Sequence, residues 1–354
     1  MQVVQNLLEK YKLEDKVIAV GVSGGADSLA LVLAAKEQLE PLGKKIVALT
    51  VDHGLRSHSA QEAQYVAQVM TRFGIEHHIL QWNGAKPTTA IEETARKMRY
   101  KLISDWCLAH NISCVMMAHH LQDLAETFLM RLQRGSGLSG LCAIREFEIL
   151  DNLIILRPFL SQKPEELKKM LRAKNLRWVE DESNANEQFL RNKIRKFLPI
   201  LEQQTGISAE NIYQTTKRLQ SAEDYIRQNL FALIEKEVVF EKNEICHFSY
   251  KMFKSLHSEM QFRLLAHLLK QTYIPRAESV LHLKEELLQP TFKGATLGAK
   301  EILLYGGQIW LVPEVPFKRK AYRPKWAEFI LKFPQYAEKK IPPMAKAIMV
   351  KDEK

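Results

Sequence analysis

The stretch Val17-Ile18-Ala19-Val20-Gly21-Val22-Ser23-Gly24-Gly25-Ala26-Asp27-Ser28 decides the fold of this chain. Its first six residues are apolar and rich in β-branched side chains, which predicts a buried strand. An apolar helical pattern follows directly after the serine-glycine turn. Glycines let backbone N–H groups approach an anion, and the positive end of a helix dipole favours negative charge. The stretch therefore predicts a strand, a phosphate-binding turn and a helix.

Every residue of this turn is a candidate for nucleotide binding: Ser23, Gly24, Gly25, Ala26, Asp27 and Ser28. The two serines add hydroxyl donors at its ends. Asp27 repels a bare phosphate, so we expect its carboxylate to face a Mg²⁺ that rides on the nucleotide. The turn matches neither G-x-x-x-x-G-K-[ST] nor G-x-G-x-x-G, which argues against a Walker loop and a dinucleotide fold.

Apolar runs and helical patterns alternate over the first half of the chain. After the run at 17–22, further strands are expected at 45–52, 75–82, 112–119 and 152–157, with helices at 28–42, 59–73, 90–110 and 122–133. This alternation predicts an α/β fold, a doubly wound parallel five-stranded sheet with helices on both faces. Ligands bind such sheets beyond the carboxyl ends of the strands, where the serine-glycine turn lies.

The character of the sequence changes after residue 161. Ser161 and Pro164 favour the start of a helix, 207–239 and 253–273 have helical patterns, and a small β element is expected near 301–312. We therefore expect a catalytic domain at 1–206, a helical linker with a mainly helical C-terminal domain at 207–315, and a basic extension at 316–354.

Composition narrows the class of protein. Among 354 residues, 46% are hydrophobic and 26% charged, which is typical of a soluble globular protein. No signal peptide and no apolar run of about 18 residues is seen, so we expect a cytoplasmic protein. The four cysteines are scattered without C-x-x-C, which disfavours a disulfide scaffold or a zinc ribbon. A net charge of +10 suits a polyanion such as RNA, with a solvated basic surface as the alternative.

Two further segments offer candidate nucleotide contacts. Asp52 and His53 end the second expected strand and are predicted to face the pocket, with Arg56 meeting phosphate or RNA. The alternative for Asp52 is a cap on the next segment. On the third expected helix, Arg99 suits bidentate binding of phosphate or carboxylate, whereas Arg96 has a glutamate four residues before it and is explained by a surface ion pair.

His119, Asp123 and Glu126 fall near i, i+4 and i+7 and share one face of a helix directed towards the strand ends. A pair of carboxylates there suits an ammonium group or a Mg²⁺, while the alternative is that acids favour the start of a helix. A metal site at His119 and His120 is disfavoured because adjacent residues point in different directions.

Two basic segments complete the set. Arg134 begins a glycine-rich segment, 134–141, which predicts a mobile loop over the site or, alternatively, a helix C-cap and turn. Arg191, Asn192 and Arg195 lie on an expected basic helix, which suits phosphate contacts, with a solvated helix as the alternative.

The turn S-G-G-x-D-S resembles the PP-loop of the N-type ATP pyrophosphatase superfamily, whose members cleave ATP between the α and β phosphates. In order, V-D-H-x-L-R, A-R-x-x-R-Y, A-H-H-x-x-D-x-x-E-T, R-G-x-G-x-x-G-L, R-P, D-x-S-N and R-N-x-I-R are also present. The whole set resembles the bacterial tRNA(Ile)-lysidine synthase family, tightly over 17–195 and loosely beyond. Many relatives have an acid where this chain has Gln122.

This resemblance implies a ligase that uses ATP and Mg²⁺. ATP adenylates the C2 oxygen of the wobble cytidine in the CAU anticodon of tRNA(Ile) and releases pyrophosphate; free L-lysine then displaces AMP, so that the tRNA reads AUA. The resemblance implies that Asp27 holds the metal, that Asp123 and Glu126 bind the lysine ammonium or accept its proton, and that Arg99 positions the α-phosphate or the lysine. RNA contacts are implied for the domain at 207–315 and for Arg56, His119, Arg134, Arg191, Asn192 and Arg195.

Some alternatives stay open at this point. A tRNA thiolase shares the PP-loop but usually needs paired cysteines, and an amidating ligase does not explain the R-N-x-I-R segment. A non-catalytic protein that binds ATP and RNA is expected to have lost Asp27 or Ser28, yet both are present. The carboxylate that acts as base and the assembly state, with a homodimer as one alternative, are not decided by the sequence.

Overall fold

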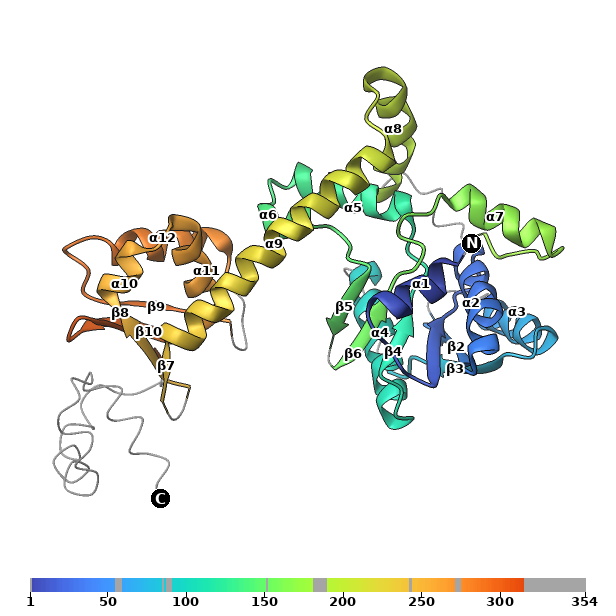
Figure 1. Cartoon of the computed structure of the whole chain (residues 1–354), viewed down its shortest axis with the longest axis horizontal. Helices are drawn as coiled ribbons and strands as arrows, with labels where there is room; N and C mark the ends of the chain where they lie inside the picture. The colour runs from blue at the N-terminus through green and yellow to red at the C-terminus, as the bar shows by residue number, and fades with distance from the viewer. Residues whose placement is uncertain are drawn as a thin grey trace. The chain divides into compact units, whose positions relative to one another are not determined.

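The structure is a computed structural model that describes residues 2–54, 59–84, 86, 91–150, 152–180, 190–241, 244–270 and 275–314. The chain divides into two compact units, Met1–Glu223 and Asp224–Lys354. Each unit is described by itself below (Figure 1). Arg56, the D-x-S-N motif at 181–184 and the basic extension at 316–354 lie outside the described residues.

The first unit alternates strands and helices as expected. Its strands are β1 (Val17–Gly21), β2 (Lys45–Asp52), β3 (Glu76–Gln81), β4 (Cys114–Met116), β5 (Phe147–Leu150) and β6 (Leu153–Leu156). Its helices are α1 (Val3–Lys10), α2 (Ala26–Leu39), η1 (Glu40–Leu42), α3 (Ser59–Arg72), α4 (Ile91–Ala109), α5 (Leu121–Gln133), α6 (Leu138–Leu141), α7 (Pro164–Ala173), α8 (Leu190–Thr205) and the first half of α9 (Ala209–Glu237).

The strands form one sheet in the order β3-β2-β1-β4-β6-β5. The pairs from β3 to β6 are all parallel, which confirms the predicted five-stranded parallel sheet. The sixth strand, β5, was not predicted; it pairs antiparallel with β6 at the edge. A mixed edge of this kind is common in doubly wound sheets.

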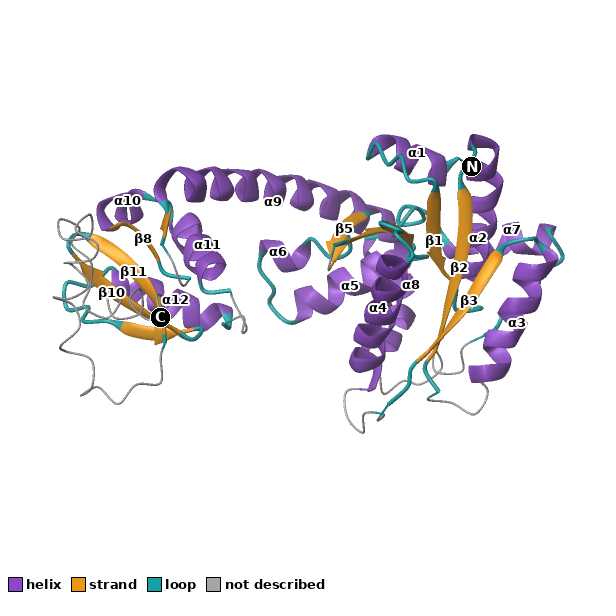
Figure 2. Ribbon diagram, turned by 90° about the horizontal axis from the view of Figure 1, so that it is seen from below, coloured by secondary structure: helices purple, strands orange, loops and turns teal. Residues whose placement is uncertain are grey.

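Side chains that alternate along β1 supply the two faces of this sheet. Ile18 and Val20 join a core with α1, α2, α3 and α7, whereas Ala19 packs with Ile103 and Cys107 of α4 on the other face. This alternation follows from the two-residue period of a strand. The sheet is therefore covered on both faces, as Figure 2 shows for β1 to β3. Ligands can reach the sheet where its strands end.

The second unit combines helices with an antiparallel sheet. Its helices are the second half of α9, α10 (Tyr250–Ser255), α11 (Ser258–Leu268) and α12 (Ala277–Leu287), and its strands are β7 (Val239–Phe240), β8 (Cys246–Ser249), β9 (Ala295–Leu297), β10 (Lys300–Tyr305) and β11 (Gln308–Pro313). The strand order is β7-β8-β11-β10-β9. Phe248, Phe253, Leu264 and Leu265 are fully buried in its core.

Three local predictions need correction. The helix expected at 253–273 is two helices, because Leu256 and His257 are extended between α10 and α11. The helix after 161 has Lys163 as its N-cap, with Pro164 in the first turn. The glycine-rich segment at 134–141 contains the short helix α6, whose Ser139 hydroxyl bonds the Glu223 carboxylate.

Within the described part of the chain, no helix combines the length and the apolar character needed to cross a membrane.

Candidate active site

The serine-glycine turn joins β1 to α2 in a conformation that is held from inside. Gly24 has a φ of +88°, which other residues rarely adopt, and Gly25 is the N-cap of α2. The Ser28 hydroxyl donates to the Gly25 carbonyl at 2.9 Å and accepts from the Ser23 N–H at 3.1 Å. Ser28 thus braces the turn, while the first N–H groups of α2 have no partner within the helix and suit an anion.

A second segment supports the turn from outside. The Val179 N–H donates to the Gly24 carbonyl at 3.0 Å. A side chain added at Gly24 would meet Val66 at 3.2 Å and Val179 at 3.4 Å. Gly24 is therefore required both by its backbone conformation and by the close packing around it.

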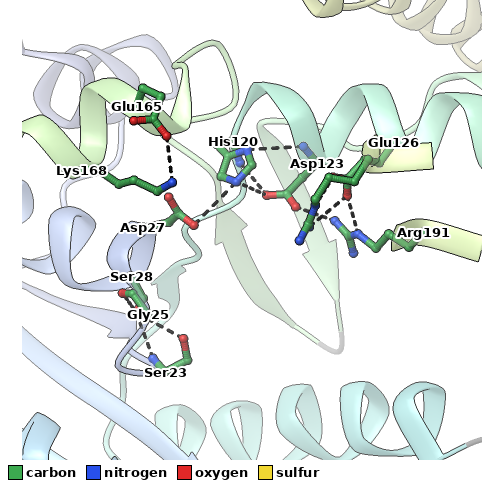
Figure 3. A network of polar contacts seen from close by, with 11 residues as sticks. Ser23, Gly25, Asp27, Ser28, His120, Asp123, Glu126, Glu165, Lys168 and Arg191 are labelled. Atoms are coloured by element: carbon green, nitrogen blue, oxygen red, sulfur yellow. Dashed lines mark hydrogen bonds and ion pairs between the residues drawn. The ribbon is translucent and has the colours of Figure 1, made fainter. Parts of the chain in front are cut away.

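Asp27, in the first turn of α2, lies close to the histidine that directly precedes α5. The Oδ2 of Asp27 lies 3.6 Å from Nε2 of His120, and the same nitrogen lies 3.5 Å from Oδ2 of Asp123 (Figure 3). His120 is also the N-cap of α5, because its ring accepts the Asp123 N–H while the Asp123 carboxylate accepts the His120 N–H at 2.9 Å. One buried imidazole therefore links the phosphate turn to the acidic start of α5.

Asp123 and Glu126 of α5 hold two arginines of α8. The Glu126 side chain is 0% exposed; its Oε2 accepts from Arg191 Nε at 2.6 Å and its Oε1 from Arg195 Nε at 2.7 Å. A second nitrogen of Arg191 donates to Asp123. The predicted carboxylate pair is thus present, and each of its members is bound to a guanidinium in this structure.

The carboxyl groups of the site are held at different pKa values. Burial raises the pKa of Asp27, against the opposing effect of the His120 ring. Burial also acts to raise the pKa of Asp123, but His120 and Arg191 outweigh it, so this pKa lies below its usual value. Asp123 is accordingly an ionised anchor for a cation.

The side chain of His119 lies in different surroundings from that of its neighbour His120. Burial, with Arg157, Arg96 and Arg191 nearby, lowers the pKa of His119 to about 3. Its Nδ1 is buried without a hydrogen-bond partner among the described residues. A neutral ring of this kind can bind substrate by a hydrogen bond but does not offer a positive charge to a phosphate.

The end of β2 supplies the other predicted nucleotide residues. The Oδ1 of Asp52 accepts the Gly54 N–H at 2.9 Å, so Asp52 caps the turn that follows β2. The His53 ring lies nearly perpendicular to that of Trp82, with the ring centroids 6.0 Å apart, and the His53 carbonyl accepts from Lys86 at 2.6 Å. β2 pairs in parallel with β1, so this turn and the phosphate turn both follow the carboxyl ends of neighbouring strands.

The remaining candidates are spread over three helices. Arg99 is partly buried on α4. Arg134 is exposed at the C-cap of α5, two helical turns beyond Glu126. Asn192 is buried on α8 between Arg191 and Arg195. The structure thus brings Asp27, Asp123, Glu126, Arg191 and Arg195 together through His120, a residue for which the sequence predicted no role.

Comparison with known proteins supports the fold. A family model described as the PP-loop domain matches residues 1–201. The U34-tRNA thiolase NcsA of Methanococcus maripaludis, solved with its [4Fe-4S] cluster, superposes with a TM-score of 0.54 at 17% identity, over 62% of this chain and 76% of that one. At this identity the likeness shows the fold alone. The fold and the site thus define a PP-loop domain, a class that uses ATP.

Curated relatives narrow the family further. The tRNA(Ile)-lysidine synthase of Orientia tsutsugamushi is 32% identical over 262 residues, which cover 72% of this chain and 59% of that protein. That of Wolbachia pipientis is 31% identical over 323 residues, 88% of this chain and 73% of that protein. The chain belongs to the tRNA(Ile)-lysidine synthase family. It spans less than two thirds of the Orientia relative's length.

Proposed function

We propose that this protein ligates free L-lysine to C2 of the wobble cytidine in the CAU anticodon of tRNA(Ile). ATP first adenylates the C2 oxygen and pyrophosphate leaves. The side-chain amine of lysine then attacks C2 and displaces AMP, which leaves lysidine and lets the tRNA read AUA as isoleucine. Family membership supports this reaction, since the named relatives are tRNA(Ile)-lysidine synthases.

The observation that carries the proposal is the position of His120 between Asp27 and Asp123. The reaction needs the phosphates of ATP and the amine of lysine at the same cytidine, one after the other. A phosphate-binding turn and a pair of carboxylates linked through one imidazole meet this need. Holding ATP and lysine close together at the carboxyl ends of the strands lowers the activation barrier of each step by proximity.

The residues present fit Mg-ATP. The Oδ1 of Asp27 is buried and has no hydrogen-bond partner among the described residues, as suits a metal ligand. The positive φ of Gly24 and the N-terminus of α2 suit phosphate oxygens. A Mg²⁺ held by Asp27 would supply charge stabilisation for the leaving pyrophosphate. Ser23 to Ser28, with Asp52 and His53 at the neighbouring turn, form the proposed nucleotide site.

Asp123 and Glu126 form the proposed site for the lysine side chain. The ammonium of lysine suits the two carboxylates that hold Arg191 here, so substrate and Arg191 compete for them. The lowered pKa of Asp123 favours binding a cation over accepting a proton. The amine must lose its proton before it attacks C2. Arg99 is proposed to position the α-phosphate or the lysine.

The RNA is proposed to lie along the basic residues that border this site. Contacts to the RNA backbone are proposed for Arg134, Arg191, Asn192 and Arg195. His119 suits a hydrogen bond to the flipped nucleotide. Arg56, which is also proposed to contact RNA, lies outside the described residues. A catalytic domain at 1–206, an RNA-binding domain at 207–315 and a basic extension at 316–354 remain our proposed division. A homodimer is a hypothesis that light scattering tests.

The cysteines argue against the thiolase alternative. All four are buried and none forms a disulfide bond; they lie at positions 107, 114, 142 and 246. Burial raises the pKa of Cys107 to about 12 and that of Cys246 to about 11, and it also raises the pKa of Cys114. Sulfur transfer needs a thiolate that is accessible, whereas all four of these thiols are buried.

The two half-reactions can be separated in one experiment. The protein is incubated with Mg-ATP and unmodified CAU-anticodon tRNA(Ile), with and without lysine, and both products are counted. We expect pyrophosphate to be released with the RNA alone and AMP only when lysine is added. Release of AMP without lysine would indicate another nucleophile, and release of neither product would contradict the proposal.

A further inference from the structure

Lys168, which has no role in the scheme above, points towards the phosphate turn. It lies on α7, and Figure 3 shows its side chain reaching towards the carboxylate of Asp27. Its positive charge acts on that carboxylate and lowers the pKa of Asp27 against the larger effect of burial. Lys168 is therefore within electrostatic reach of the place where phosphates are expected.

The helix that carries Lys168 is fixed to the turn. Leu167 and Leu171, on either side of Lys168, are buried in the core that α2 shares. After α7, the chain returns to the turn, where the Val179 N–H donates to the Gly24 carbonyl and the Arg177 carbonyl accepts from the Tyr65 hydroxyl at 2.6 Å. The backbone at Lys168 is consequently held in a defined position beside the turn.

The ammonium of Lys168 is paired with an exposed carboxylate, that of Glu165. It donates to Oε1 of Glu165 at 2.8 Å, one helical turn earlier. The Glu165 side chain is 68% exposed and that of Lys168 is 35% exposed. Exposed pairs of this kind contribute little to stability. A phosphate chain with several negative charges can compete with one exposed carboxylate for the ammonium.

The site needs a cation at this point. Asp27 and Asp123 are both acidic, and the charge of Asp123 already raises the pKa of Asp27. An incoming triphosphate adds further negative charge, against which a helix N-terminus offers about half an elementary charge. His120 faces the two carboxylates. Lys168 adds a full charge and three donors on the α7 side of the turn.

We propose that Lys168 binds the β- and γ-phosphates of ATP and the pyrophosphate that leaves, turning from Glu165 to the phosphate oxygens. This inference rests on the proposed use of ATP and adds a ligand-binding residue to it. The group recognised is a pyrophosphate unit, so AMP, which lacks both of these phosphates, does not require Lys168.

The test compares binding of three probes by calorimetry: inorganic pyrophosphate, ATP and AMP, each with Mg²⁺. Lys168→Met is compared with Lys169→Met, which removes the same charge from the exposed neighbour on α7. We expect Lys168→Met to weaken pyrophosphate and ATP about tenfold, the loss typical of a charge-assisted hydrogen bond, and AMP less than about twofold. Lys168→Arg, which keeps the charge, should stay within about threefold of the parent protein.

Two results would overturn the inference. Equal pyrophosphate affinity in the Lys168→Met and Lys169→Met proteins would show that Lys168 is not a ligand. Equal weakening of AMP and pyrophosphate would show that the substitution disturbs the turn as a whole. None of these probes needs RNA or lysine, so loss of pyrophosphate binding would support the role of Lys168 even if no lysine entered RNA.

Discussion

Nε2 of His120 lies 3.6 Å from Oδ2 of Asp27, so the residue that caps α5 contacts a carboxylate in the first turn of α2. His120→Asn tests this relationship. Asparagine is a good N-cap and preserves the start of α5, but its short side chain loses the contact with Asp27. We expect pyrophosphate release to fall about tenfold or more with an unchanged melting temperature, whereas His120→Ala should also lose about 1 kcal/mol of stability. Parent-like activity in both variants would contradict the link.

Asp27→Asn tests the proposed metal ligand. The amide has nearly the same shape but lacks the charge that holds Mg²⁺, so RNA-dependent pyrophosphate release should fall about 100-fold or more. Asp105→Asn, which alters an exposed carboxylate paired with Lys101, is the control and should remain active. Steady-state release at saturating Mg-ATP measures both, and equal rates would remove Asp27 from the site.

Glu126→Gln tests the buried carboxylate as a structural element. Two guanidiniums would face a neutral amide, which costs about 1–3 kcal/mol and lowers the melting temperature by roughly 3–10 °C. Glu259→Gln is the control, because its bond to Arg263 has the same 2.7 Å length as that from Arg195 to Glu126, whereas the Glu259 side chain is 46% exposed. Differential scanning calorimetry compares them, and similar shifts in both would contradict the assigned burial of charge.

The pH dependence of stability tests His77, a partly buried histidine of β3. Burial, with the charge of His78, lowers the pKa of His77 to about 4, while its ring bonds the Thr50 hydroxyl at 2.8 Å. The unfolded chain takes up this proton near pH 6.5, so it binds more protons than the folded chain between about pH 4 and 6.5. Stability from neutral His77 is complete above this window and is lost as the pH falls through it.

His77→Gln should therefore show a smaller fall in the free energy of unfolding between pH 7 and pH 5 than the parent. Glutamine can keep a bond to Thr50 and does not titrate. His282→Gln, at an exposed position, should reproduce the parental slope. Urea denaturation at each pH gives the free energies, and parallel curves for all three proteins would refute the assigned pKa.

Thiol alkylation tests the exclusion of sulfur chemistry. The four cysteines are buried, and burial holds the pKa values of three of them above the usual value. Iodoacetamide should label the native protein at least about tenfold more slowly than the urea-unfolded protein and leave its ligase activity unchanged. Rapid inactivation that follows labelling of one cysteine would restore a thiolase mechanism.

Much of the fold was predictable because its central strands are buried on both faces. The strand expected at 45–52 is β2 with the same bounds, since five consecutive buried apolar or hydroxyl side chains leave little choice of limits. β5 was missed because its four residues form an exposed edge, with Ile149 64% exposed, and only pairing with β6 makes them a strand.

The site was predictable as a set of residues but not as a set of contacts. The spacing of Asp123 and Glu126 predicted a shared face, yet nothing local indicated that Arg191 and Arg195 pair with them from more than sixty residues away. Histidine is not a usual N-cap, so no local pattern indicated that His120 caps the start of α5. Lys168 depends in the same way on the packing of α7 against α2.

Incorporation of labelled lysine into RNA tests the central claim most directly. The protein is incubated with Mg-ATP, labelled lysine and unmodified CAU-anticodon tRNA(Ile), with methionine tRNA as the control for an identical anticodon. We predict ATP-dependent label in tRNA(Ile), located at the wobble cytidine, and none in the methionine tRNA. An active, folded protein that releases pyrophosphate but leaves no lysine in tRNA(Ile) would contradict the claim.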